Sequence, residues 1–297
     1  MTASVMSRVA GAPISWGVSE VEGWGVQLPT ETVLSAMYES GLTATELGPA
    51  GFLPTDPDQL KADLDKHSLR AVAQFVPVVL HDESTDPRPD VRTAIASLSA
   101  VGATTLVLAA ATGGQGYDDR PAWTSAAWSR ALGLLDDLAG LGREAGLDAV
   151  LHPHVGTMIE NEAEVERVLD GCGIGLCLDT GHLLIGGADP VALARAHADR
   201  IRHVHLKDVR LDLAEQVRTG AVSYSDAVER GIYAPIGDGD VEINRIVKDL
   251  ENQGYSGWYV LEQDTVLGSE SANTATADVR TSLRALSRIA EGLEVRR

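Results

Sequence analysis

Four apolar runs of this sequence each end in a side chain that can bind a metal ion. The runs are DAVLHPH (148–154), GLCLDTGH (175–182), IRHVHLKD (201–208) and WYVLEQD (258–264). The candidate ligands are His152, Asp179, His205 and Glu262. Two imidazoles and two carboxylates suit Mn²⁺, Co²⁺, Fe²⁺ or Zn²⁺ better than Ca²⁺. The pattern predicts one divalent-metal site, and the alternative is four unrelated polar residues that cap strands.

Additional histidines lie close to the candidate ligands. In HPH, His152 and His154 share one strand face, because side chains on a strand repeat every two residues. We expect His152 to bind the metal and His154 to contact substrate or support a ligand, with the reverse order left open. His182 follows Asp179 by three residues. It either reaches a substrate oxygen or caps a helix and fixes a loop.

The run HVHLKD carries two histidines and a lysine. His205 is nearer the end of the strand and is the better ligand, whereas His203 could line the interior one layer below as a core histidine. Lys207 then lies at or above the end of the strand. It could stabilise an enolate oxygen or simply pair with Asp208, and the sequence does not separate these two roles.

Two residues earlier in the chain are candidate substrate contacts. Glu46 lies in the run TATELG (43–48), at the end of a predicted strand, and could contact substrate or be a buried carboxylate that holds the first loops. Trp16 could stack on the C–H face of a polyol or pack in the core. Glu262 could act as a base toward a substrate carbon as well as binding the metal. No GxSxG motif is present, so nucleophilic hydrolysis has little support.

These side chains need elements that bring them together. Eight apolar runs have the character of buried parallel strands, at 9–16, 43–47, 71–80, 104–110, 148–154, 175–182, 201–208 and 258–264. Helical stretches alternate with them, at 31–40, 57–67, 90–101, 122–145, 160–169, 189–198, 242–253 and 275–292. This alternation, without a GxGxxG turn after the first strand, predicts a single (β/α)8 TIM-barrel domain over residues 1–297. In such a barrel the carboxyl ends of the strands form one active-site face.

Local signals refine this arrangement. Thr30 is expected to cap the first helix, Asp56-Pro57 to open the second, and Asp240 to lie near the start of the helix at 242–253. The longest irregular region, 208–236, is expected to form a loop with one short helix over the barrel mouth.

Composition narrows the class of protein. The chain has 297 residues, 44% of them hydrophobic, and a formal net charge of −19, so it can bury a large core. Nucleic-acid binding is not expected, because it usually needs a basic stripe. Two cysteines, no signal-peptide pattern and no membrane-length apolar run predict a cytoplasmic protein without a membrane partner. A homo-oligomer is left open.

The sequence resembles the xylose isomerase-like TIM-barrel superfamily of sugar-phosphate isomerases and epimerases. The motifs that carry this resemblance are TATELG (43–48), LDTGH (178–182), HVHLKD (203–208), GDGDV (237–241) and YVLEQD (259–264). Within the superfamily the chain most resembles inosose (2-keto-myo-inositol) dehydratases, through APISWG (12–17), ELGPAGFLP (46–54) and LHPHVGT (151–157). The resemblance implies substrate contact by His182 and metal ligation by His152, Asp179, His205 and Glu262.

The fifth strand departs from the pattern of the ketose epimerases in this superfamily. Those enzymes carry a glutamate ligand there, which works with the strand-eight glutamate as an acid–base pair on opposite faces of the substrate. This chain has His152 at that position, which weakens the epimerase interpretation.

We therefore expect a divalent-metal-dependent lyase that dehydrates a keto-cyclitol or related keto-sugar through a metal-stabilised enediolate. The candidates for proton transfer are Glu262, His182 and Lys207. The candidates for substrate contact are His154, Glu46 and Trp16. Mn²⁺ or Co²⁺ is the expected ion, with Mg²⁺, Fe²⁺ and Zn²⁺ as alternatives. A ketose isomerase or epimerase with the same metal site is the alternative function, and a metal-poor binding or accessory subunit is the third.

Overall fold

Eight parallel strands form a closed barrel in the computed structural model, which describes residues 4–114, 116–268 and 272–294. Around the barrel the strand order is β1-β10-β7-β6-β5-β4-β3-β2. The strands are β1 Val9–Gly11, β2 Ala44–Glu46, β3 Arg70–Val79, β4 Thr105–Ala111, β5 Asp148–Leu151, β6 Gly175–Asp179, β7 Ile201–Leu206 and β10 Tyr259–Leu261. The predicted TIM-barrel fold is confirmed.

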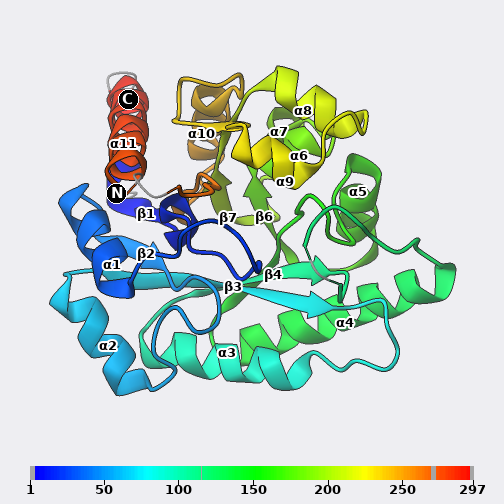
Figure 1. Cartoon of the computed structure of the whole chain (residues 1–297). Helices are drawn as coiled ribbons and strands as arrows, with labels where there is room; N and C mark the ends of the chain where they lie inside the picture. The colour runs from blue at the N-terminus through cyan, green and yellow to red at the C-terminus, as the bar shows by residue number, and fades with distance from the viewer. Residues whose placement is uncertain (1–3, 115, 269–271, 295–297) are drawn as a thin grey trace.

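Helices follow the strands and surround the barrel (Figure 1). The outer helices are α1 Thr30–Glu39, α2 Pro57–Lys66, α3 Arg88–Ala100, α4 Ser125–Glu144, α5 Glu162–Gly171, α7 Pro190–Ala196, α10 Ile243–Asn252 and α11 Ala272–Glu294. Near the N-terminus, two 3₁₀ turns flank β1, η1 Val5–Arg8 and η2 Pro13–Trp16, and α11 lies beside them in Figure 1. No helix of the described residues is long and apolar enough to cross a membrane.

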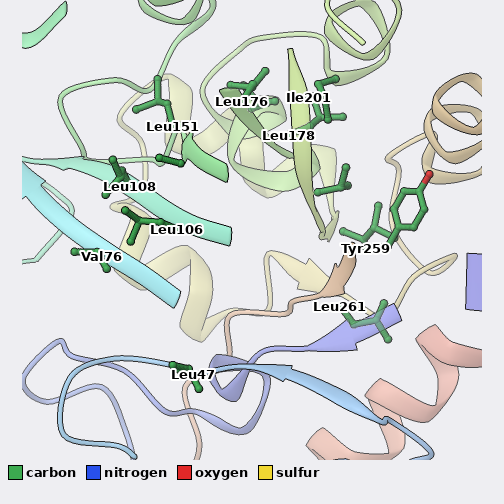
Figure 2. Close-up of a cluster of buried hydrophobic side chains, with 14 of the residues drawn as sticks. Leu47, Val76, Leu106, Leu108, Leu151, Leu176, Leu178, Ile201, Tyr259 and Leu261 are labelled. Atoms are coloured by element: carbon green, nitrogen blue, oxygen red, sulfur yellow. The ribbon is translucent and has the colours of Figure 1, made fainter. Parts of the chain in front are cut away.

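Strand alternation divides the core into two layers. Leu176 and Leu178 of β6 belong to the large cluster between the barrel and its helices, part of which Figure 2 shows. Because side chains alternate along a strand, Cys177 and Asp179 face the barrel interior instead. The interior cluster is made mainly of small residues, Ala10, Ala12, Ala44, Val72, Ala73, Val107, Val150, Cys177 and Val260. This small lower layer leaves space for long polar side chains above it.

Several predicted strands end earlier than expected, and for three of them the structure shows a local reason. The first stops at Gly11, and Pro13 opens η2, because proline lacks the N–H that a central strand needs. The fifth stops at Leu151, just before the segment HPH, in which Pro153 again lacks a backbone N–H. The sixth stops at Asp179, which caps the short helix α6 Thr180–Ile185. The shorter fifth and sixth strands still deliver His152 and Asp179 to the same rim.

The region 208–236 is more ordered than the sequence indicates. It contains two helices rather than one, α8 Leu211–Arg218 and α9 Tyr224–Glu229. Its ends pair as a two-stranded antiparallel sheet of β8 Asp208–Val209 and β9 Tyr233–Ala234. We call residues 208–241 the mouth segment.

The predicted helix starts are partly right. Asp56 caps α2 with its side chain, as expected. Thr30 is the first residue of α1 rather than its cap, and its hydroxyl donates to the carbonyl of Phe52. Asp240 lies just before Glu242, the N-cap of α10, as expected, but its side chain accepts from the backbone N–H of Leu211 at the start of α8. Both contacts join residues that are far apart in sequence, and local sequence patterns cannot predict such contacts.

A single buried carboxylate organises the mouth segment. Asp208 accepts hydrogen bonds from four backbone N–H groups, those of Val209, Gly237, Gly239 and Val241, at 2.8–3.2 Å. Asp208 is 2% exposed, so water cannot replace these bonds. The GDGD turn predicted at 237–240 is thus held by the residue that follows Lys207.

We expect Asp208→Asn to lower the free energy of unfolding by about 2–4 kcal/mol. The amide keeps one acceptor oxygen, but its NH₂ group replaces the other and cannot accept. The buried backbone N–H groups that pointed to that oxygen lose their partner, at a cost of about 1–3 kcal/mol each. Urea denaturation measures the change. Asp238→Asn, at an exposed position of the same turn, is the matched control and should change stability by less than about 0.5 kcal/mol. Equal effects of the two variants would contradict this role.

Candidate metal centre and substrate pocket

The four predicted ligands come together at the carboxyl-terminal rim of the barrel. One ligand atom from each of His152, Asp179, His205 and Glu262 lies within 4.8 Å of all the others. Asp179 and His205 are direct partners in the β6–β7 ladder. Glu262 and His152 each follow the last residue of their strand, at β10 and β5. The common period of two along neighbouring strands is what aims these side chains at one point.

Short distances define the centre. His152 Nε2 lies 3.1 Å from Asp179 Oδ2. His205 Nδ1 lies 2.7 Å from Glu262 Oε2 and 3.6 Å from Asp179 Oδ2. The other oxygen of Asp179, Oδ1, accepts from the backbone N–H groups of Gly181 and His182 at 2.9 and 2.7 Å. The helix cap therefore orients Asp179 so that Oδ2 faces the imidazoles.

Two atoms of the centre have the character of metal donors. Among the described residues, His205 Nδ1 and Glu262 Oε2 are buried and lack a hydrogen-bond partner. The contact between His205 Nδ1 and Glu262 Oε2 is short but does not have hydrogen-bond geometry. Buried polar atoms normally find a partner, and a divalent ion would supply one to His205 and Glu262 together. The residues therefore fit a single divalent ion with mixed nitrogen and oxygen ligands.

The charge balance keeps the carboxylates ionised. Burial disfavours the charged form of Glu262, but His205 and Lys207 outweigh this effect and hold its pKa at about 2. The pKa of Asp179 is likewise well below its usual range, because Lys207 and His182 overcome the effect of burial. Ionised carboxylates are the form that binds a metal.

Lys207 is the cation of the site, and it does not pair with Asp208. Its Nζ lies 2.6 Å from Asp264 Oδ1, 2.9 Å from His182 Nε2 and 3.2 Å from Glu262 Oε2. Burial opposes its charge, but the surrounding carboxylates raise the pKa of Lys207 well above its usual range. The ammonium group is thus held beside the metal centre.

A pocket opens above the centre. Its polar lining includes Glu20, Glu46, His152, His154, Lys207, Glu262 and Asp264. Its apolar walls include Ile14, Val18, Trp24, Phe75, Tyr117 and Tyr224. Metal ligands, a cation and an additional imidazole therefore face one space with aromatic walls, which is the composition of a small-molecule site.

Two predicted substrate contacts lie elsewhere. Trp16 is fully buried, does not line the pocket, and donates through Nε1 to the hydroxyl of Thr276 in α11. Its position corresponds to the core alternative and not to a wall against substrate. His182 is also fully buried and does not line the pocket. It contacts Lys207 and packs against the ring of His154, with 3.6 Å between ring centroids.

His154 does line the pocket. Its Nδ1 lies 2.7 Å from the carbonyl of Val155, and the ring of Tyr117 packs over it at 4.5 Å between centroids. Burial, together with His152 and Lys207, lowers the pKa of His154 well below its usual range. A neutral His154 that donates from Nδ1 presents Nε2 as an acceptor.

Several residues of the pocket carried no signal in the sequence. Tyr224 comes from α9 and donates to Asp264 Oδ2 at 2.8 Å. Tyr117 donates to Glu20 at 2.5 Å, which joins two loops across the pocket. Trp24 donates to the carbonyl of Thr265. All come from loops or from the mouth segment, where no strand period indicates which side chains point inward.

The chain belongs to the family of xylose isomerase-like TIM barrels, whose model matches residues 34–289. It is 35% identical to the rhizopine catabolism protein MocC of Rhizobium meliloti, over 88% of this chain and 83% of that protein. It is 33% identical to an inosose dehydratase of Geobacillus kaustophilus, over 86% and 87%. Among solved structures, an IolI protein with a bound zinc atom has the same fold, with a TM-score of 0.69, 12% identity, and coverage of 96% of this chain and 99% of that chain. The predicted superfamily is confirmed.

We expect Asp179→Asn to weaken Mn²⁺ binding by about 100-fold or more, because it removes a ligand charge while the amide oxygen still caps α6. Competition with a chelator of known affinity measures the loss. Asp189→Asn is the matched control, since Asp189 caps α7 in the same way but lies outside the centre. Equal affinities of the two variants would show that Asp179 does not bind the ion.

Proposed function

We propose that this chain is a divalent-metal-dependent lyase that removes water from a keto-cyclitol or a related keto-sugar. Two lines of support join here: relatives named inosose dehydratases match most of the chain at about one-third identity, and the site combines metal-type ligands with a lysine and an imidazole that face the pocket. The ion would be held by His152, Asp179, His205 and Glu262, with Mn²⁺ or Co²⁺ expected. When bound, it would polarise a carbonyl and the neighbouring hydroxyl and stabilise the charge of an enediolate.

The observation that carries the choice of reaction is His152. Epimerisation removes a proton from one face of a carbon and returns one to the other face, so it needs two acid–base groups on opposite sides. With an imidazole at the strand-five position, Glu262 is the one carboxylate among the ligands of β5 and β10. Elimination needs one base at the α-carbon and one acid near the leaving hydroxyl, and it does not require that symmetry.

The pocket offers groups for both steps. Glu262 and Lys207 line it 3.2 Å apart, and His154 lines it next to them. In the first step the α C–H bond breaks, a basic group takes the proton, and the electron pair forms the C=C bond of the enediolate. In the second step the carbonyl re-forms, the C=C bond shifts to lie between the α- and β-carbons, and the β C–O bond breaks, so that the hydroxyl leaves as water after it receives a proton from an acidic group. His182 lies behind Lys207 and would support that side chain rather than touch substrate.

The aromatic walls and the polar side chains of the pocket suit a polyhydroxylated ring. Tyr117 and Phe75 present apolar faces, while Glu20 and Asp264 offer acceptors for hydroxyl groups. Removing bulk water from such a pocket strengthens the electrostatic interactions in it. The cytoplasmic location predicted from the sequence, and the oligomeric state, stay predictions.

We expect the Mn²⁺-loaded protein to convert 2-keto-myo-inositol, or another keto-sugar of a small panel, into a product that is lighter by one water. Mass spectrometry and the absorbance of an enone or enol detect it. In D₂O, deuterium should exchange into the α-carbon of the remaining substrate before or while water is lost. Interconversion of two ketose epimers at constant mass would instead establish the isomerase or epimerase alternative. A protein that purifies without metal and takes up none when it is incubated with Mn²⁺ would favour the accessory-subunit alternative.

We expect Lys207→Met to lower turnover by about 10²–10⁴-fold, the usual contribution of a positioned acid–base group, while metal content stays close to one ion per chain. The thioether chain fills the space of the lysine stem but carries no charge. His182→Ala should also retain metal and should lower turnover less, because His182 acts through Lys207. Activity assays paired with elemental analysis separate the two quantities. Parallel loss of metal in either variant would contradict these roles.

A further inference from the structure

Glu46 occupies an unusual position for a residue at the end of β2. Its Oε1 lies 2.8 Å from His205 Nε2 and 2.7 Å from His203 Nε2. All three residues are at most 2% exposed. One buried carboxylate oxygen therefore accepts from two imidazoles of β7, and neither of the roles considered from the sequence describes this arrangement.

The contact spans the barrel. Between β2 and β7 lie β1 and β10 in the strand order, so Glu46 reaches across their inner face. That face carries Ala10, Ala12 and Val260, which are short enough to let the glutamate pass. A larger residue on β1 at this level would block the contact. Glu46 can therefore reach β7 only because the side chains of this interior layer are small.

Both ring nitrogens of His205 face carboxylates, but only Nε2 makes a hydrogen bond. Nδ1 faces Glu262 and Asp179, and it has no hydrogen-bond partner among the described residues. Nε2 faces Glu46. A neutral imidazole carries its proton on the nitrogen that has an acceptor and offers a lone pair on the other. An ionised carboxylate at Nε2 therefore selects the tautomer whose Nδ1 lone pair points to the metal centre.

His203 completes the arrangement. It lies two residues before His205 on the same strand face, one layer deeper in the barrel. Its Nε2 shares the oxygen that receives His205, so Glu46 is tied to two points of β7 and cannot turn away without losing both. Histidine ligands commonly donate their second N–H to a carboxylate, which fixes the ring and raises its basicity.

We propose that Glu46 is a positioning residue of the metal centre, which holds His205 in the Nε2–H tautomer, and that His203 fixes Glu46 in place. This inference rests on the metal-binding part of the proposed function and is independent of whether the reaction is dehydration or epimerisation. The role proposed for Glu46 is thus to orient a metal ligand, whereas the sequence suggested a contact with substrate.

Three variants test the proposal. Glu46→Leu removes the acceptor, Glu46→Gln keeps an acceptor oxygen but loses the charge, and His203→Phe keeps a ring but removes the second N–H. Glu251→Gln is the matched control, because Glu251 is a buried carboxylate (9% exposed) that accepts from Arg8 and Tyr259 outside the centre. Affinity for Mn²⁺ and Zn²⁺ alone is measured by chelator competition, and thermal unfolding reports whether each variant is folded.

We expect Glu46→Leu to weaken the binding of both ions by about 10–100-fold. Glu46→Gln and His203→Phe should give smaller losses, and Glu251→Gln should leave affinity unchanged even where it lowers the melting temperature. Wild-type affinity in a folded Glu46→Leu or Glu46→Gln variant, or equal losses in Glu46→Gln and Glu251→Gln, would overturn the proposal.

A second readout needs no metal. In the metal-free protein with ¹⁵N-labelled histidine, the Nε2–H proton of His205 should be shifted downfield and protected from exchange with water by its hydrogen bond to Glu46, and Glu46→Leu should remove both signs. If the wild-type protein binds neither ion, the metal part of the proposed function fails, and the Nε2–H measurement still decides the role of Glu46. An unchanged Nε2–H signal in Glu46→Leu would overturn it.

Discussion

The compensation of buried negative charge is the constraint on which the centre of this barrel depends. Glu46, Asp179 and Asp264 are each less than 9% exposed, and Glu262 lies beside them. An uncompensated buried carboxylate costs several kcal/mol, so each of them must have a partner. Lys207 pairs with Asp264 and Glu262, the histidines of β7 donate to Glu46, and the start of α6 donates to Asp179. After these partners are assigned, His205 Nδ1 and Glu262 Oε2 still lack a hydrogen-bond partner among the described residues. Their lone pairs are available to bind a metal ion.

The mouth segment extends the same compensation outward. Asp208 holds the GDGD turn through backbone N–H groups, and this turn closes the segment that carries α9. From α9, Tyr224 reaches Asp264, which in turn holds Lys207. The order of the mouth segment is therefore connected to the position of the lysine by a chain of hydrogen bonds. In a barrel enzyme whose specificity lies in its loops, this links the shape of the pocket to the charge at its floor.

Neighbouring histidines in this site have separate tasks because their surroundings differ. His205 faces carboxylates on both sides, His154 faces the pocket under Tyr117, and His182 lies behind Lys207 with no access to the pocket. Equivalent imidazoles are thus suited to three different proposed roles, those of a ligand, a pocket-facing acceptor and a support. The proposed dehydration uses this division, since elimination needs different groups at the α-carbon and at the leaving hydroxyl.

Much of this architecture could be predicted from the sequence. Apolar runs of strand length alternate with amphipathic stretches, which indicated the barrel. Polar residues at the ends of those runs indicated one rim, because parallel strands in a barrel bring their carboxyl ends to the same face. The period of two then selected His152, Asp179, His205 and Glu262, and the structure brings all four within 4.8 Å. These signals are local, since each can be read within a single strand.

Only the tertiary structure decided which residues meet across the barrel. Glu46 reaches β7 because the strands between them carry small side chains, and no pattern within TATEL contains that information. Trp16 lies in the core because the chain turns into η2 one residue after β1 and meets α11. Tyr224 and Tyr117 reach the pocket through segments without a strand period. Sequence patterns determine which way a side chain points on its own strand, whereas the partner that it meets depends on the closure of the barrel and on the space that distant residues leave open.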